Sequence, residues 1–94
     1  MGSHRSEEKI NIDILQVILD KRGKGEKARQ QSLIYGANLN FPMFRKYKSR
    51  LLDAGFITED MEGRNRVYDI TSRGIDYLRE GKSIERALHP LMNK

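Results

Sequence analysis

Basic side chains are concentrated in one stretch of the chain. Between residues 21 and 50 the sequence holds a single acid, Glu26, and the bases Lys21, Arg22, Lys24, Lys27, Arg29, Arg45, Lys46, Lys48 and Arg50. The whole chain has 94 residues and a formal charge of +5, so the flanking segments are close to balanced or acidic. Ammonium and guanidinium groups bind phosphate oxygens, and a localised excess of them is typical of nucleic-acid binding. The alternative is an ordinary solvated surface.

Residue types suited to catalysis or metal binding are sparse. The chain has no cysteine, and its histidines are His4, in a start that resembles a tag remnant, and His89. The acidic pairs are neighbours in sequence, as is usual for solvated ends: Glu7/Glu8 and Glu59/Asp60. The segment "GKGEK" lacks the spacing of a phosphate-binding loop. We therefore expect no catalytic site, no metal and no cofactor.

Two helices are predicted before the middle of the chain. The first covers residues 7–22, with a cap at Ser6, a stop at Gly23 and apolar residues at helical spacing: Ile10, Ile14, Leu15, Ile18 and Leu19. The second is predicted over residues 26–35, burying Ala28, Leu33 and Ile34 and ending at Gly36. A tight turn, "GANLN", follows it.

The third predicted helix, residues 41–54, has two chemically different faces. Asn40 is the expected N-cap, with Phe41 as the alternative because a residue before proline resists helical angles. Phe44, Tyr47 and Leu51 form an apolar stripe, on which Lys48 also lies. The opposite face holds Pro42, Arg45, Lys46, Ser49, Arg50 and Asp53. Such a helix buries one face and directs the other outward, and Gly55 ends it.

The side-chain period then changes to two. Residues 56–61 and 66–71 predict a β-hairpin with Gly63 in its tip, beside Arg64 and Arg66. Thr71 begins another predicted helix, which Gly81 interrupts. A short heptad-like seam runs through the C-terminal segment at Tyr77, Gly81, Ile84, Leu88 and Leu91.

This order of elements predicts a winged helix-turn-helix: mainly α with a small β-hairpin (α+β), and an additional C-terminal helix. The segments "ANLNFPMFRKYKSRLLDAGFI" and "YDITSRGIDYL" also resemble a family of small archaeal winged helix-turn-helix DNA-binding proteins. The resemblance covers roughly residues 10–80. It implies a double-stranded DNA-binding regulator or chromatin-associated protein, commonly a dimer through its last helix.

The DNA contacts are predicted from these elements. A helix in the major groove needs donors for base edges and cations for phosphates, and the expected residues are Asn40, Arg45, Lys46, Ser49 and Arg50. Arg45 or Arg50 would bind a guanine, or both would bind only phosphates. The wing would contribute Arg64 and Arg66, or remain solvated. The expected backbone contacts at the flank are Lys24, Lys27, Arg29 and Asn38, although Asn38 is also suited to capping.

The sequence predicts one DNA-binding domain over residues 7–71, after a tag remnant or disordered start at 1–6. Residues 72–94 are predicted to form a helical segment for homodimerisation through Tyr77, Ile84, Leu88 and Leu91. We expect a cytoplasmic, nucleoid-associated protein with no membrane partner, and no small-molecule effector is evident. The alternatives are a protein-interaction module that meets an acidic partner, a non-specific architectural chromatin protein, and an RNA-binding protein.

Overall fold

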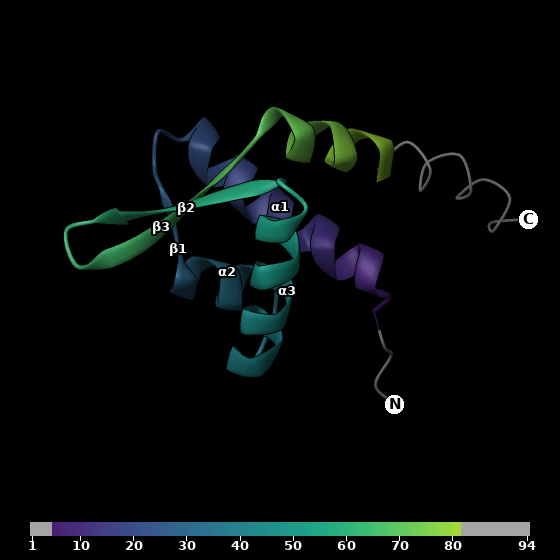
Figure 1. Cartoon of the computed structure of the whole chain (residues 1–94), viewed down its shortest axis with the longest axis horizontal. Coiled ribbons are helices and arrows are strands. Elements are labelled where there is room, and N and C mark those ends of the chain that lie inside the picture. Colours follow the sequence, from purple (N-terminus) through teal and green to yellow (C-terminus); the bar gives the residue numbers. More distant parts are fainter. Residues whose placement is uncertain (1–4, 82–94) are drawn as a thin grey trace, which may run out of the picture.

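A computed structural model describes residues 5–81 of the chain, which form four helices and three strands (Figure 1). The order is α1 (Glu7–Gly23), β1 (Ala28–Arg29), α2 (Gln30–Gly36), α3 (Phe41–Asp53), β2 (Ile57–Glu62), β3 (Asn65–Ile70) and a final helix over residues 72–81. The predicted fold class, a winged helix-turn-helix of the α+β type, is confirmed. Within the described residues, no helix is long and apolar enough to cross a membrane.

The sheet has three antiparallel strands in the order β1-β3-β2. The predicted hairpin is present, with Glu62 paired to Asn65 around a tip that contains Gly63 at φ 64°. Strand β1 was not predicted, and the helix predicted over 26–35 begins only at Gln30. Ala28 pairs with Tyr68 and is buried, so hydrogen bonding to β3 holds this backbone extended where a helical pattern was inferred.

Helix α1 lies at the centre of the core. The predicted apolar residues Ile10, Ile14, Leu15 and Ile18 are buried, and so is Ile12, which lies outside that stripe. The reason is the helix over 72–81, which covers a further face of α1. A Cβ on Gly81 would lie 2.7 Å from Cδ1 of Ile12, so a larger residue would fit here only if the Ile12 side chain shifted. Gly81 is helical and is the last described residue, so the interruption predicted at Gly81 concerns residues that lie outside the described part of the chain.

The helix ends follow local capping chemistry. The Ser6 side chain accepts a hydrogen bond from the N–H of Lys9, as predicted. Gly23 was wrongly expected to be the left-handed stop of α1. It is still helical, and Gly25, at φ 74°, takes the left-handed conformation two residues later. The backbone N–H groups of residues 24, 25 and 26 donate to the carbonyls of Lys21 and Arg22. The left-handed residue of this turn therefore lies two positions later in the chain than predicted.

The final described helix is fixed to the end of α3. Thr71 caps it by accepting from the N–H of Gly74 at 3.0 Å, and its hydroxyl donates to the carbonyl of Gly55 at 2.7 Å. Tyr77 stacks on Phe56 with ring centroids 4.7 Å apart. Tyr77 of the predicted dimer seam thus packs within its own chain. The other seam residues, Ile84, Leu88 and Leu91, lie outside the described residues.

Candidate nucleic-acid interface

Helix α3 is anchored by its apolar stripe and exposes its basic face. Phe44, Tyr47 and Leu51 are buried, and the ring of Phe44 meets Tyr68 of β3 edge-on at 6.0 Å. The assignment of Tyr47 to the core is confirmed. The predicted contact residues are all exposed: Asn40, Arg45, Lys46, Ser49 and Arg50. Burial of one stripe therefore fixes the direction in which the other face points.

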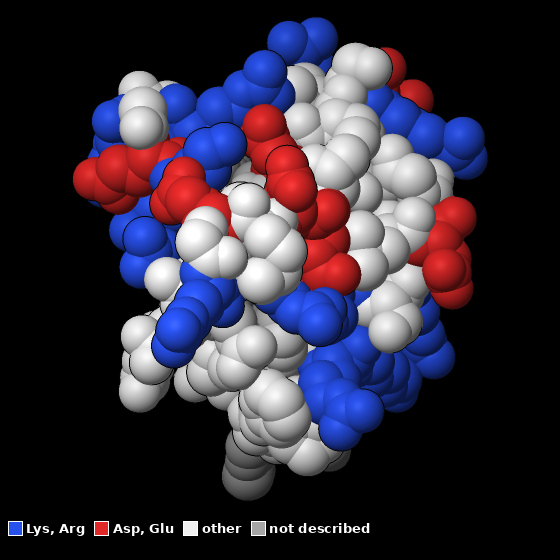
Figure 2. Space-filling view, turned by 60° about the vertical axis from the view of Figure 1, so that its left-hand side comes forward, with Lys and Arg blue, Asp and Glu red and all other residues white. Residues whose placement is uncertain are grey.

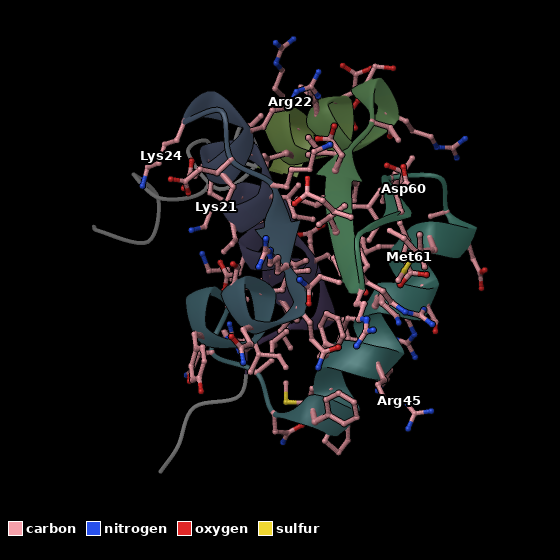
Figure 3. All side chains as sticks on the ribbon, turned by 90° about the vertical axis from the view of Figure 1, so that its left-hand side faces the viewer. Lys21, Arg22, Lys24, Arg45, Asp60 and Met61 are labelled. Atoms are coloured by element: carbon pink, nitrogen blue, oxygen red, sulfur yellow. The ribbon has the colours of Figure 1, made fainter. Side chains whose placement is uncertain are left out.

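Arg45 occupies the open part of this face. Its guanidinium carbon lies 5.8 Å from the ring centroid of half-exposed Phe41, and no ion pair among residues 5–81 involves it. In Figure 3 the Arg45 side chain projects from α3 away from the body of the protein. An unpaired guanidinium is free to bind two acceptors side by side, such as the O6 and N7 atoms of guanine.

The turn before α3 is set by two asparagines. Asn40 is the N-cap, as predicted: its Oδ1 accepts from the N–H of Met43 at 2.9 Å. The alternative, Phe41 as the cap, is wrong, because Phe41 is the first residue of α3. Asn38 has φ 55°, a left-handed conformation that asparagine tolerates after a helix. Asn38 is exposed, and its carbonyl accepts from Arg5 at 2.9 Å.

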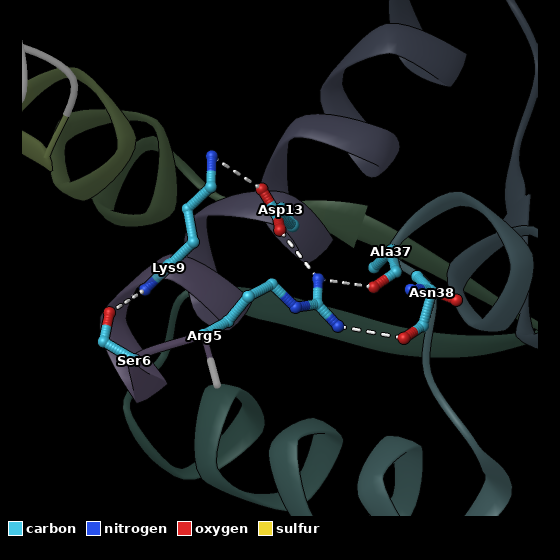
Figure 4. A network of polar contacts seen from close by, with 6 residues as sticks. All are labelled: Arg5, Ser6, Lys9, Asp13, Ala37 and Asn38. Carbon is cyan, nitrogen blue, oxygen red and sulfur yellow. Dashed lines mark hydrogen bonds and ion pairs between the residues drawn. The ribbon is translucent and has the colours of Figure 1, made fainter. Parts of the chain in front are cut away.

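Arg5 ties this turn to α1, a role that the sequence did not indicate. Its guanidinium donates to Asp13 of α1 at 2.8 Å and to the carbonyls of Ala37 and Asn38 at 2.7 and 2.9 Å (Figure 4). Lys9 adds a second cation 3.2 Å from the Asp13 carboxylate. The two carbonyls lie 32 and 33 residues beyond Arg5, so no local pattern pairs them with it. This network holds the helix-turn-helix turn in place.

Lys46 and Arg50 lie on the side of α3 that faces the start of α1. Both contact the carboxylate of Glu7, at 3.9 Å from Nζ of Lys46 and 3.0 Å from Nη1 of Arg50. The hydrogen bond from Arg50, more than any other cause, holds the pKa of Glu7 below its ordinary value. These two cations therefore differ from Arg45, because they share an internal carboxylate whereas Arg45 has no ion pair within the described residues.

The wing is attached to α3 through Glu59 of β2. Its carboxylate accepts from the hydroxyl of Tyr68 at 2.7 Å and pairs with Lys48 and Arg66 at 3.3 Å each. Lys48 lies on the apolar stripe, as predicted, and is partly buried; its extension to Glu59 was not predicted. The bond from Tyr68 is the main cause of the lowered pKa of Glu59, and burial is the main cause of the raised pKa of Tyr68.

A basic hollow lies between the wing tip and the start of α2. It has a volume of about 410 Å³ and is lined by Arg29, Gln30, Gln31, Arg64, Asn65 and Arg66. Pairing of β1 with β3, in which Arg29 opposes Val67, brings Arg29 to the two wing arginines. Arg29 pairs with Glu62 at 3.5 Å, whereas Arg64 has no ion pair within the described part of the chain. The hollow offers guanidinium and amide donors to an anion.

The basic stretch of the sequence does not form one face. Lys21, Arg22 and Lys24 lie at one end of the molecule and Arg45 at the other (Figure 3). Lys24 and Lys27 are exposed and lie at the turn after α1. Figure 3 shows that Lys24 is distant from α3. Arg22 donates to the carbonyl of Ile70 at 3.1 Å, and Lys21 pairs with Glu26 at 3.3 Å. A band of acidic side chains also separates basic groups in Figure 2.

The described residues hold no group of three or more side chains arranged to bind a metal ion.

No curated protein sequence matches the chain. The profile of the winged helix-turn-helix family matches residues 4–89, and the chain belongs to this family. The family predicted from the motifs is therefore confirmed.

Solved structures show the same fold. Sso10a-2, a DNA-binding protein from Sulfolobus solfataricus, is 25% identical, with a TM-score of 0.78 over 95% of this chain and 87% of that one. AF1382 from Archaeoglobus fulgidus is 17% identical, with a TM-score of 0.67 over 96% and 93% of the two chains. MepR, a transcription regulator from Staphylococcus aureus, is 14% identical, with a TM-score of 0.73. The match covers 93% of this chain but only 62% of MepR.

Proposed function

We propose that the protein binds double-stranded DNA and regulates transcription, with α3 in the major groove and the wing on the backbone or in the minor groove. The observation that carries the proposal is the division of α3 into two faces. Phe44 and Leu51 are buried while Arg45, with no ion pair among residues 5–81, points outward. The major groove of B-DNA admits one α-helix, and a guanidinium at its surface can bind a guanine.

The comparisons support both parts of this proposal, the binding of DNA and the regulation of transcription. Sso10a-2 is described as a DNA-binding protein and matches nearly the whole chain. A MepR variant of the same fold has been solved with an oligodeoxyribonucleotide, at 13% identity and a TM-score of 0.70. MepR itself is described as a transcription regulator, which favours a regulatory role over catalysis.

We assign distinct roles to the exposed cations. Arg45 is proposed to contact a base, because it has no ion pair in the described structure, and exposed Ser49, one turn further along α3, is proposed to assist it. Lys46 and Arg50 are proposed to contact phosphates on the α1 side, since Glu7 holds them toward that flank. On the opposite flank, the hollow formed with Arg29, Arg64 and Arg66 is suited to a backbone phosphate. Asn38 lies in the turn before α3 and would reach only the backbone.

Binding of duplex DNA is tested by fluorescence anisotropy over a salt series. If about six phosphates are contacted, the logarithm of the association constant should fall against the logarithm of salt with a slope of about −5. Heparin is the control polyanion at matched charge. An affinity for duplex no greater than for heparin would contradict the proposal, and equal affinity for all duplex sequences would assign an architectural role instead.

We further propose that the protein is a homodimer through residues beyond the described helix, at Ile84, Leu88 and Leu91. The spacing of these residues supports the proposal, as does the small core of a chain of this length. A chain ending at Lys82 keeps the packed helix over 72–81 and removes the seam. Light scattering should give twice the chain mass for the full protein and the single mass for the shortened one. An unchanged mass would exclude this segment as the dimer contact.

A further inference from the structure

Glu7 places one negative charge beside the basic face of α3. The same oxygen, Oε2, lies 3.0 Å from Arg50 and 3.9 Å from Lys46, two cations that are four residues apart on α3. The three side chains are about half exposed or more, with relative accessibilities of 63, 50 and 52% for Glu7, Arg50 and Lys46. The cluster is therefore open to a ligand that approaches α3.

This cluster is not needed to hold α3 in place. Phe44, Tyr47 and Leu51 already attach the helix to the core, and ion pairs as exposed as these contribute little to folding stability. The consequence of the Glu7 contacts lies in binding. A duplex on α3 brings its phosphates toward Lys46 and Arg50, where they meet the carboxylate of Glu7.

We propose that Glu7 competes with DNA phosphates for Arg50 and Lys46, and so limits the affinity of α3 for DNA of any sequence. The inference rests on the proposed DNA binding. Each phosphate contact on this flank must replace an existing ion pair, whereas Arg45 has no ion pair to lose within the described structure. Sequence-independent binding is thereby weakened more than base recognition, which raises the ratio of specific to non-specific affinity.

The test compares Glu7→Gln with Glu8→Gln on a random-sequence duplex by anisotropy. Both substitutions remove one negative charge from the first turn of α1, so they change the net charge and the helix-dipole interaction equally. Of the two acids, only Glu7 contacts α3 in the described structure. We expect E7Q to bind about three- to tenfold more tightly than E8Q, with a log–log salt slope steeper by about one.

A double-mutant cycle assigns the gain to the two cations. In a chain that already carries Lys46→Ala and Arg50→Ala, E7Q and E8Q should bind equally. If the wild type binds duplex but E7Q binds no more tightly than E8Q, the competing role of Glu7 is overturned and DNA binding stands. A gain that persists without Lys46 and Arg50 also overturns it. If the wild type binds no duplex, the proposed function fails, and this inference fails with it.

Discussion

At the scale of single residues, identical side chains differ in what they can still bind. Arg45 and Arg50 were equivalent candidates for a base contact in the sequence. The structure separates them, because Arg50 is held by Glu7 at 3.0 Å while Arg45 projects from the surface beside Phe41. This difference shows why the sequence could identify both arginines as candidate base contacts but not which of the two is free to bind. Their ranking depends on an acid in another helix, 43 residues away from Arg50.

Arg45→Ala should change the preferred base at one position of the binding site, at a cost of about 1–3 kcal/mol against the best sequence.

Lys46→Ala should instead weaken binding to all sequences alike and make the salt slope shallower by about one. Selection from a randomised duplex library, followed by anisotropy on the selected site, checks both. An unchanged base preference in Arg45→Ala would assign Arg45 to phosphate.

Glu59 is expected to make folding stability sensitive to acid. Its pKa is lowered from the ordinary value of 4.5, chiefly by the Tyr68 hydroxyl, so the folded state favours the charged carboxylate. The stabilisation is complete above pH 4.5 and is lost as the pH falls through the lower folded-state pKa. Glu59→Gln should lower the free energy of unfolding by about 1 kcal/mol at pH 7 and by less in acid.

Urea denaturation of wild type and Glu59→Gln at pH values from neutral to acidic measures this difference. Glu8→Gln serves as the control for loss of an acid in general. A destabilisation by Glu59→Gln that stayed constant down to the lowest pH would show that the carboxylate charge is not its cause.

At the scale of elements, local chemistry was sufficient to predict α3, the hairpin and the N-caps of α1 and α3, but not the left-handed turn after α1. Ser6 and Asn40 cap their helices through their own side chains, and the two faces of α3 are visible in its spacing. Strand β1 could not be predicted in this way, because Ala28 is held extended by Tyr68 of β3. Burial of Ile12 likewise depends on Gly81 of a distant helix. Contacts of this kind leave no periodic signal near the residue.

The packing of the helix over 72–81 predicts the effect of a substitution at Gly74. A Cβ on Gly74 would lie 2.3 Å from the backbone oxygen of Phe56, which cannot rotate away. Gly74→Ala should therefore lower the free energy of unfolding by about 1–3 kcal/mol. Gly23→Ala is the matched control, because Gly23 is helical and its Cβ would meet nothing within 4 Å.

Gly23→Ala should stabilise the protein by up to about 1 kcal/mol, since alanine is the better helix former. Urea denaturation of the two variants gives both values. Equal stabilities for Gly74→Ala and wild type would mean that the final helix is not packed on the end of α3 as described.

At the scale of the whole molecule, folding divides a charge pattern that is continuous in the sequence. The bases between residues 21 and 50 suggested one surface, but Lys21, Arg22 and Lys24 lie at the opposite end of the molecule from Arg45. Pairing of β1 with β3 gathers a different set, in which Arg29 joins Arg64 and Arg66. The sequence therefore predicted which basic residues are candidates for binding but not which of them share a surface, because a surface is defined by tertiary contacts.

The most direct test of the proposed surface is an NMR titration of the nitrogen-labelled protein with duplex DNA. We predict that the largest amide shifts fall in the outward part of α3, around Arg45 and Ser49, and at the wing tip around Arg64. The turn at Lys24 should change little. Large shifts around Lys21 and Lys24, with α3 unchanged, would contradict the proposal that α3 is the DNA-binding helix.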